Sequence, residues 1–203
     1  IEQIHKIEVI KPDESIFSDF EKITENNLYL FKRFFLEEFL EVTELENLKE
    51  EIDEFYSIII SELKDNPKVI NHYDFESRNL ISLSEKKIGV IDFQDALIGP
   101  LGIDLASIFK DLYKKWTKEE ILEWLDFYVE NSQIVKTASL KTAEVKRMVD
   151  IASLQRQTRI LGKLSQVFLE LKRSARLKDF KTILKYLMTC LLYTSDAADD
   201  LLC

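Results

Sequence analysis

The chain has 203 residues, of which 46% are hydrophobic and 32% are charged, and its formal net charge at neutral pH is -9. This length and balance indicate one globular domain or one large lobe of a bigger protein, and they exclude a disordered or fibrous chain. The negative charge argues against a nucleic-acid partner, and no apolar run reaches the roughly 20 residues that a membrane span requires.

Residues that break helices are scarce, with four glycines and three prolines in the whole chain. This scarcity predicts a mainly helical fold, and it excludes a Gly-rich phosphate loop or a Rossmann fingerprint within these residues. The two cysteines, Cys190 and Cys203, form neither a metal-binding pattern nor a disulfide framework. With no visible secretion signal, we expect a cytoplasmic protein without a membrane partner.

The first third of the chain predicts helices. It opens in a helical segment, and residues 14–41 carry apolar side chains at helical spacing, including a run of phenylalanines. Such spacing is typical of core packing rather than of a ligand cage. A second helix is predicted over about 44–64 and ends at Asn66-Pro67, because proline cannot continue the hydrogen-bond ladder.

Short extended segments follow this proline. Residues 68–70 predict a short strand or the entry to a loop, and residues 80–83 and 88–91 predict two strands joined by a hairpin turn at 84–87. Gly99-Pro100 indicates a second break in the chain.

The remainder of the chain predicts helices again. One covers about 103–113, and the next begins at Thr117, where Thr-Lys-Glu-Glu forms a capping box. A long helix is predicted over 141–170 and a last one over 177–189. We therefore expect one domain over residues 1–190.

The tail over 191–203 differs from the rest of the chain. Its acidic stretch has no amphipathic period, and it resembles translated sequencing-adapter read-through. We expect it to be a non-native tail, the alternative being a genuine solvated acidic end.

One strip of sequence carries the chemistry. It reads His72-Tyr73-Asp74-Phe75-Glu76-Ser77-Arg78-Asn79, then the predicted hairpin, then Val90-Ile91-Asp92-Phe93-Gln94-Asp95. Transfer of a phosphoryl group to a hydroxyl needs a carboxylate that accepts the hydroxyl proton and oxygen ligands that hold Mg²⁺ against the phosphates. Asp74 fits the first role, and the Asn79 amide oxygen and the Asp92 carboxylate fit the second.

A further carboxylate opens the helix after the strip. Asp104 lies twelve residues beyond Asp92, at a predicted helix N-terminus. A buried carboxylate there is suited to accept backbone N–H bonds from the catalytic loop and so to anchor it.

At these residues the chain resembles the aminoglycoside phosphotransferase and choline kinase family of small-molecule kinases, over about residues 60–190. The segments His-x-Asp-Phe-x-Ser-Arg-Asn-Leu, Gly-Val-Ile-Asp-Phe-Gln-Asp-Ala and Gly-Pro are similar to those of bacterial kinases that phosphorylate N-acetylmuramate and N-acetylglucosamine at the anomeric hydroxyl. The segments at 154–156 and 160–162 are similar to the same branch.

The resemblance implies ATP and Mg²⁺ as cofactors. It implies Asp74 as the catalytic base, Asn79 and Asp92 as metal ligands, and His72 and Asp104 as supports of the catalytic loop. Tyr73 stands where the family often has Gly or Arg, so backbone freedom or a cation is lost there; we expect activity to survive.

Other side chains are candidates for substrate binding. Arg78 faces either the substrate or a structural ion-pair partner, because Arg suits oxyanions. Asp95 either assists the site or is an ordinary loop carboxylate. Three further candidates lie on the long predicted helix, namely Gln155, Arg156 and Arg159. This helix either forms a wall of the acceptor pocket or presents a solvated face. In the first case, an Arg would pair with the lactyl carboxylate of an N-acetylmuramate-like substrate.

The implied fold is α+β and mainly α, namely the C-terminal lobe of a protein-kinase-like fold with a small β-hairpin at the catalytic loop. The family's N-terminal lobe, with its ATP-covering loop and phosphate-pairing Lys, is missing from these residues. Ile1–Val9 would lie just past the hinge. We expect the isolated fragment either to fold incompletely or to bind ATP poorly, and to be inactive.

Several functions are compatible with these motifs. The first is an amino-sugar 1-kinase of cell-wall recycling. A kinase of the same fold for an aminoglycoside, choline or homoserine is the alternative, and the acidic chain suits a cationic acceptor. A non-catalytic pseudokinase fragment is the third, and intact Asp74, Asn79 and Asp92 speak against it.

Overall fold

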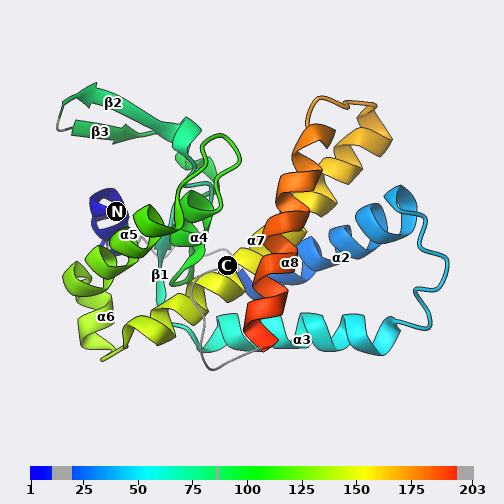
Figure 1. Ribbon diagram of the computed structural model, residues 1–203, viewed down its shortest axis with the longest axis horizontal. Helices are drawn as coiled ribbons and strands as arrows, with labels where there is room; N and C mark the ends of the chain where they lie inside the picture. Colours follow the sequence, from blue (N-terminus) through cyan, green and yellow to red (C-terminus); the bar gives the residue numbers. More distant parts are fainter. Residues whose placement is uncertain (11–19, 86, 196–203) are drawn as a thin grey trace.

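A computed structural model describes residues 1–10, 20–85 and 87–195 of the chain, with side chains up to residue 191. Most of these residues are helical, and the strands form two separate antiparallel pairs (Figure 1). The elements are α1 Glu2–Glu8, α2 Phe20–Leu30, the π-helix η2 Phe31–Phe39, α3 Lys49–Asp65, β1 Lys68–Asn71, the 3₁₀ turn η3 Ser77–Asn79, β2 Leu80–Ser84, β3 Lys87–Val90, η4 Phe93–Asp95, β4 Leu97–Pro100, α4 Ile103–Phe109, α5 Lys118–Asn131, α6 Gln133–Thr137, α7 Thr142–Leu171, η5 Leu177–Asp179 and α8 Phe180–Ser195.

The long helix α7 is the centre of the molecule. The elements α2, η2, α3, α4, α5 and α8 pack against it, and Figure 1 shows it crossing the fold between α5 and α8. Gly162 permits the close approach of η2, because a Cβ atom there would lie 2.6 Å from the backbone nitrogen of Phe31. The expectation of one long helix over 141–170 is confirmed within two residues.

The phenylalanine run of the first third packs in the core, as its helical spacing predicts. Phe31 and Phe35 stack with their ring centroids 5.3 Å apart, and Phe39 meets Phe168 and Phe180 edge-on. The predicted helix over 14–41 is described from residue 20 onward, and its second half is a π-helix. Residues 14–19 of that prediction lie outside the described residues.

The hairpin of β2 and β3 is confirmed, with Leu80 opposite Val90 and Ile81 opposite Gly89. The interpretation of Gly99-Pro100 as a simple break is wrong, because both residues belong to β4, which pairs with β1. Pro100 lies opposite Lys68 at the end of this two-stranded sheet, where a residue without an N–H group is tolerated.

Other element boundaries differ from their sequence-based positions. The second helix begins at Lys49 rather than near residue 44, since residues 43–48 form turns with bonds such as Asn47 N–H to the Glu44 carbonyl. The helix α4 ends at Phe109, and α8 continues to Ser195, into the stretch expected to be a tail. Residues 196–203 of that tail lie outside the described residues.

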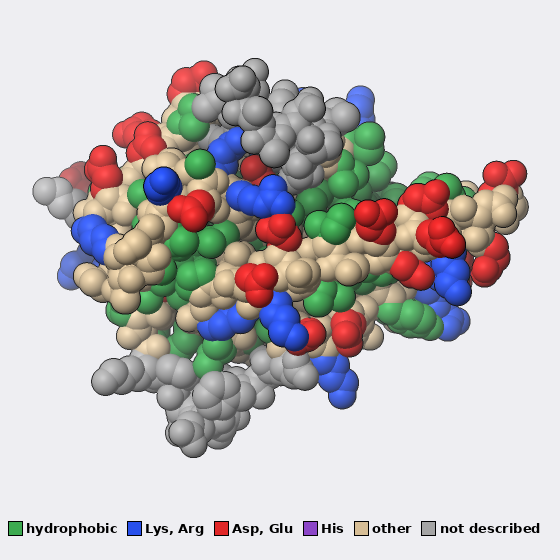
Figure 2. Space-filling model, turned by 90° about the horizontal axis from the view of Figure 1, so that it is seen from below, with side chains coloured by type: hydrophobic (Ala, Val, Ile, Leu, Met, Phe, Trp, Pro, Cys, Tyr) green, Lys and Arg blue, Asp and Glu red, His purple; other side chains and the backbone are tan. Residues whose placement is uncertain are grey.

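The charged side chains are interspersed on the face that Figure 2 shows. Acidic and basic residues alternate there over the described surface, without one continuous basic stripe.

The predicted capping box at α5 is present, with Glu120 N–H donating to the Thr117 hydroxyl and Thr117 N–H donating to the Glu120 carboxylate.

The first helix buries a carboxyl group against α5. Glu8 accepts a hydrogen bond of 2.7 Å from the Tyr128 hydroxyl, and burial raises the pKa of Glu8 to about 7. Because this pKa lies above the ordinary value of 4.5, the protonated form is favoured by folding. The resulting stability is present below pH 4.5 and is lost as the pH rises through 7.

Replacement of Glu8 by Gln keeps an oxygen that accepts from Tyr128 and removes the ionisation. We expect Glu8→Gln to equal the wild type at pH 4 and to exceed its free energy of unfolding at pH 8 by about 3 kcal/mol. Urea unfolding at both pH values measures this, with the exposed Glu2→Gln of the same helix as control. A pH-independent difference between Glu8→Gln and the wild type would contradict the assignment.

Candidate active site

The catalytic loop is tied to the start of α4 by a buried carboxylate. The backbone N–H groups of His72 and Tyr73 donate to Asp104 at 2.7 and 2.9 Å, and Asp104 is only 2% exposed. Burial raises the pKa of Asp104 above its ordinary value, while the two N–H bonds act in the opposite direction. These two hydrogen bonds are the contacts that an anchoring role of Asp104 would require, and the role itself stays a prediction.

His72 joins the catalytic loop to the hairpin that carries Asp92. Its ring is fully buried, and Nε2 lies 2.8 Å from the carbonyl oxygen of Ile91. Since a carbonyl only accepts, Nε2 carries the proton in this bond. The position of His72 is that of a packing and positioning residue, consistent with the supporting role implied by the sequence.

Two residues of the site have left-handed backbone conformations. Tyr73 has φ 72° and Asp92 has φ 76°, a region that favours glycine and that costs other residues of order 1 kcal/mol. Tyr73, which stands where the resemblance leads us to expect Gly or Arg, thus has a backbone conformation that favours glycine. Its hydroxyl accepts a hydrogen bond from Asn27 at 3.0 Å, and its ring lies 4.2 Å from the Arg159 guanidinium carbon.

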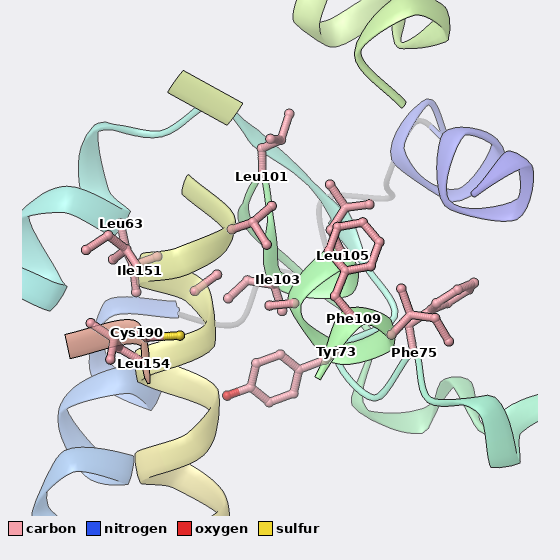
Figure 3. Packing of buried hydrophobic residues seen from close by; sticks show 14 of the residues in the cluster. Leu63, Tyr73, Phe75, Leu101, Ile103, Leu105, Phe109, Ile151, Leu154 and Cys190 are labelled. Carbon is pink, nitrogen blue, oxygen red and sulfur yellow. The ribbon is translucent and has the colours of Figure 1, made fainter. Parts of the chain in front are cut away.

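The core holds the residues on either side of Asp74. Tyr73 and Phe75 belong to the buried cluster, with exposed fractions of 6% and 2%, and Figure 3 shows them packed close to Phe109. The Asp74 side chain retains 25% exposure between them. Its Oδ1 accepts a hydrogen bond of 2.9 Å from Arg159, whereas Oδ2 lies 3.8 Å from Arg78 Nη2, which leaves Oδ2 to accept from another donor.

Asn79 and Asp92 are brought together by the hairpin. The Ile91 N–H donates to the Asn79 carbonyl at 3.1 Å, and Asp92 follows Ile91 with an exposed side chain. The side-chain amide of Asn79 donates to the Asp74 carbonyl at 2.8 Å. Its donor side is therefore committed to the catalytic loop, and its oxygen is the atom that it offers to a cation.

This donor set suits Mg²⁺. An amide oxygen and a carboxylate are hard ligands, and Mg²⁺ bound with phosphates takes only one or two protein groups. Within the described residues, no group of three or more His, Cys, Asp or Glu side chains is placed to hold a metal ion. A site of this kind does not require such a cluster.

A cavity of about 240 Å³ adjoins Asp74. It lies between the catalytic loop, the segment after α4, helix α7 and the α7–α8 connection. The lining residues are Asp74, Glu76, Arg78, Leu112, Tyr113, Arg159, Ile160, Lys163, Leu164 and Arg176. This cavity is lined by Asp74, the residue expected to be the base.

Only some of the residues that the sequence suggested for substrate binding line this cavity. Arg78 lines it and pairs with Glu76 at 2.7 Å, so the structural ion pair is present and a contact with the substrate stays a prediction. Asp95 is exposed in η4 and does not line the cavity. Gln155 and Arg156 are each 1% exposed and do not line it either, so the solvated-face alternative is wrong for both. Arg159 supplies the helical wall instead.

Two buried acidic residues that support the site were not identified from the sequence. Glu76 forms an ion pair with the buried Arg156 of α7, and Asp111 accepts from the Ser77 N–H at 2.6 Å. Asp111 lies seven residues after Asp104, a spacing that places both carboxylates on one face of the helix predicted over 103–113, although α4 itself ends at Phe109. This spacing is the feature of the sequence from which Asp111 could have been identified.

The sequence profile of the APH phosphotransferase enzyme family matches residues 3–138. The chain belongs to this family. The match includes the catalytic loop, the hairpin and α4, which are elements that position Asp74, Asn79 and Asp92. The kinase-like fold expected from the motifs is thereby confirmed.

Curated relatives in this family carry a more specific name. The chain is 26% identical over 168 residues to the N-acetylmuramate/N-acetylglucosamine kinase of Pseudomonas putida, covering 82% of this chain and 49% of that protein. It is 34% identical over 106 residues to the Neisseria meningitidis kinase of the same name, covering 50% and 30%. The chain therefore spans about half or less of the length of these relatives.

Solved phosphotransferases share the fold. An ethanolamine kinase from Plasmodium vivax superposes with a TM-score of 0.64 at 16% identity, covering 97% of this chain and 59% of that one. An ADP-bound aminoglycoside phosphotransferase gives 0.58 at 18% identity, covering 94% and 62%. Within the described ranges of the phosphotransferase chain, no helix combines the length and apolarity needed to cross a bilayer.

Proposed function

We propose that this chain carries the acceptor site and the Mg²⁺ ligands of an ATP-dependent kinase that phosphorylates the anomeric hydroxyl of an amino sugar. The observation that carries the proposal is the Asp74 carboxylate, which lines the cavity while the Asn79 amide fixes its backbone. The relatives named N-acetylmuramate/N-acetylglucosamine kinase support the amino-sugar acceptor. Their substrates also suggest a cytoplasmic role in cell-wall recycling.

Asp74 acts as the base in this proposal. Oδ2 accepts the proton of the sugar hydroxyl, the hydroxyl oxygen bonds to the γ-phosphorus of ATP, and the bond to the bridging oxygen breaks to release ADP. Arg159 holds Oδ1, which orients the carboxylate. Asn79 and Asp92 would hold Mg²⁺, which supplies charge neutralisation at the phosphates.

The nucleotide is proposed to be covered by a lobe that precedes Ile1. The relatives' greater length supports this, since the chain covers 49% of the Pseudomonas putida protein. The 203-residue chain alone should then bind ATP weakly. Extension through the upstream coding sequence is expected to raise ATP affinity by at least about tenfold, measured by calorimetry, because the covering loop and its Lys would add phosphate contacts.

An acceptor panel tests the proposed function. The upstream-extended enzyme is incubated with ATP, Mg²⁺ and, separately, N-acetylmuramate, N-acetylglucosamine, kanamycin, choline or homoserine, and products are identified by ³¹P NMR. We expect an anomeric sugar phosphate and no product from the cationic acceptors, because Arg78, Arg159, Lys163 and Arg176 line the cavity. Turnover of kanamycin or choline without turnover of either sugar would refute the amino-sugar assignment.

A further inference from the structure

The cavity beside Asp74 is basic although the chain is acidic. Four of its lining residues are cations, namely Arg78, Arg159, Lys163 and Arg176, and two are carboxylates, Asp74 and Glu76. The whole chain carries a formal net charge of -9. A local excess of positive charge in a concave site attracts anions and disfavours cations.

The two carboxylates are already paired within the protein. Asp74 accepts from Arg159, and Glu76 binds both Arg78 and the buried Arg156. Neither carboxylate therefore neutralises Lys163 or Arg176, the other two cations of the lining. The unpaired positive charge in the lining belongs to Lys163, while Arg176 shares its charge with Asp179.

Lys163 is one helical turn beyond Arg159 and lines the same cavity. Within the described part of the chain it forms no hydrogen bond or ion pair, so its ammonium donors are available. Arg159, by contrast, is held by Asp74 and the Tyr73 carbonyl, and its Nε–H is buried without a hydrogen-bond partner among the described residues.

Arg176 completes this wall from the α7–α8 connection. Its Nη1 donates to the Tyr113 hydroxyl at 2.5 Å, and its Nε binds Asp179. The guanidinium lies over the Tyr113 ring, 5.1 Å from the centroid. These contacts fix the group in place and leave Nη2 as its remaining donor, on a residue that lines the cavity.

We propose that Lys163 and Arg176 form a specificity site for a negatively charged group on the acceptor, so that the enzyme selects a sugar acid over its uncharged counterpart. This inference rests on the proposed function. N-acetylmuramate differs from N-acetylglucosamine by a lactyl ether at O3, and its carboxylate is the group that the two cations would bind. The anomeric hydroxyl would then face Asp74, at the other side of the cavity.

Direct binding tests the specificity site without dependence on turnover, since residues 74–176 of the 203-residue chain supply every lining side chain. Calorimetry of the wild-type chain is expected to show N-acetylmuramate binding about tenfold more tightly than N-acetylglucosamine, a preference that shrinks as NaCl is raised. Lys163→Gln should reduce this ratio by about fivefold, through weaker N-acetylmuramate binding alone. Arg176→Gln should reduce it by a similar factor.

The controls separate this site from general charge effects. Lys6→Gln removes an exposed cation on α1, outside the cavity, and should leave the ratio unchanged. Lys163 is itself exposed, so its variant is expected to fold, which circular dichroism checks. Equal affinity for the two sugars, or an unchanged ratio in Lys163→Gln, overturns the inference while the kinase function stands. Failure of both sugars to bind overturns it together with the amino-sugar assignment.

Discussion

Replacement of the base Asp74 by Asn is expected to lower kcat of the upstream-extended enzyme by about 10²- to 10⁴-fold, because proton transfer by a positioned group contributes a factor of that size. The amide oxygen of Asn still accepts from Arg159, so the local geometry is kept while the proton acceptor is lost. The acceptor KM should change by less than about threefold, since the substitution removes a contact made chiefly in the transition state.

The control for this experiment is Asp126→Asn, which makes the same chemical change on the exposed face of α5. It should retain wild-type turnover. If Asp74→Asn also retained turnover, Asp74 would not be the base, and the non-catalytic alternative would regain its place.

The second large effect concerns the stability of the catalytic loop. Arg156 is 1% exposed, and its guanidinium binds Glu76 and donates to the Ser107 hydroxyl at 3.1 Å. Arg156→Met leaves the Glu76 carboxylate without this partner in a buried setting. We expect it to lower the free energy of unfolding by about 3 to 5 kcal/mol, measured by urea denaturation of the 203-residue chain.

A matched pair and a double variant make this prediction specific. Arg147 and Glu62 form an exposed ion pair, so Arg147→Met should cost less than about 1 kcal/mol. The double variant Arg156→Met with Glu76→Gln should recover more than half of the loss, because the buried carboxylate that lost its Arg156 partner is gone. A loss in Arg156→Met no larger than that in Arg147→Met would contradict the buried-pair interpretation.

The catalytic loop and the hairpin could be predicted from the sequence because their chemistry is local. His72, Asp74 and Asn79 lie within eight residues, and the alternation of residues 80–91 indicates the hairpin that presents Asp92. Asp104 was also predictable, since it opens a predicted helix twelve residues after Asp92 and the resemblance implies a loop support there. These residues interact over short separations or through a recurring motif.

Long-range pairings were not predictable in the same way. β4 contains Gly99 and Pro100, which indicate a turn, and its partner β1 lies about thirty residues earlier. Likewise, Arg156 meets Glu76 across 80 residues, and Arg159 meets Asp74 across 85. Helical periodicity placed these arginines on α7, but only tertiary packing decides which of them is buried and which lines the cavity.

The central claim is that Asn79 and Asp92 hold one divalent cation beside Asp74. Electron paramagnetic resonance of Mn²⁺ with ADP and the upstream-extended enzyme measures it most directly, because Mn²⁺ takes the same oxygen ligands as Mg²⁺. We predict one bound Mn²⁺ in the wild type, with affinity lowered at least about tenfold in Asp92→Asn and in Asn79→Leu. Glu85→Gln, which removes an exposed carboxylate at the tip of the same hairpin, should bind as the wild type does. Unchanged Mn²⁺ affinity in both Asp92→Asn and Asn79→Leu would contradict the account.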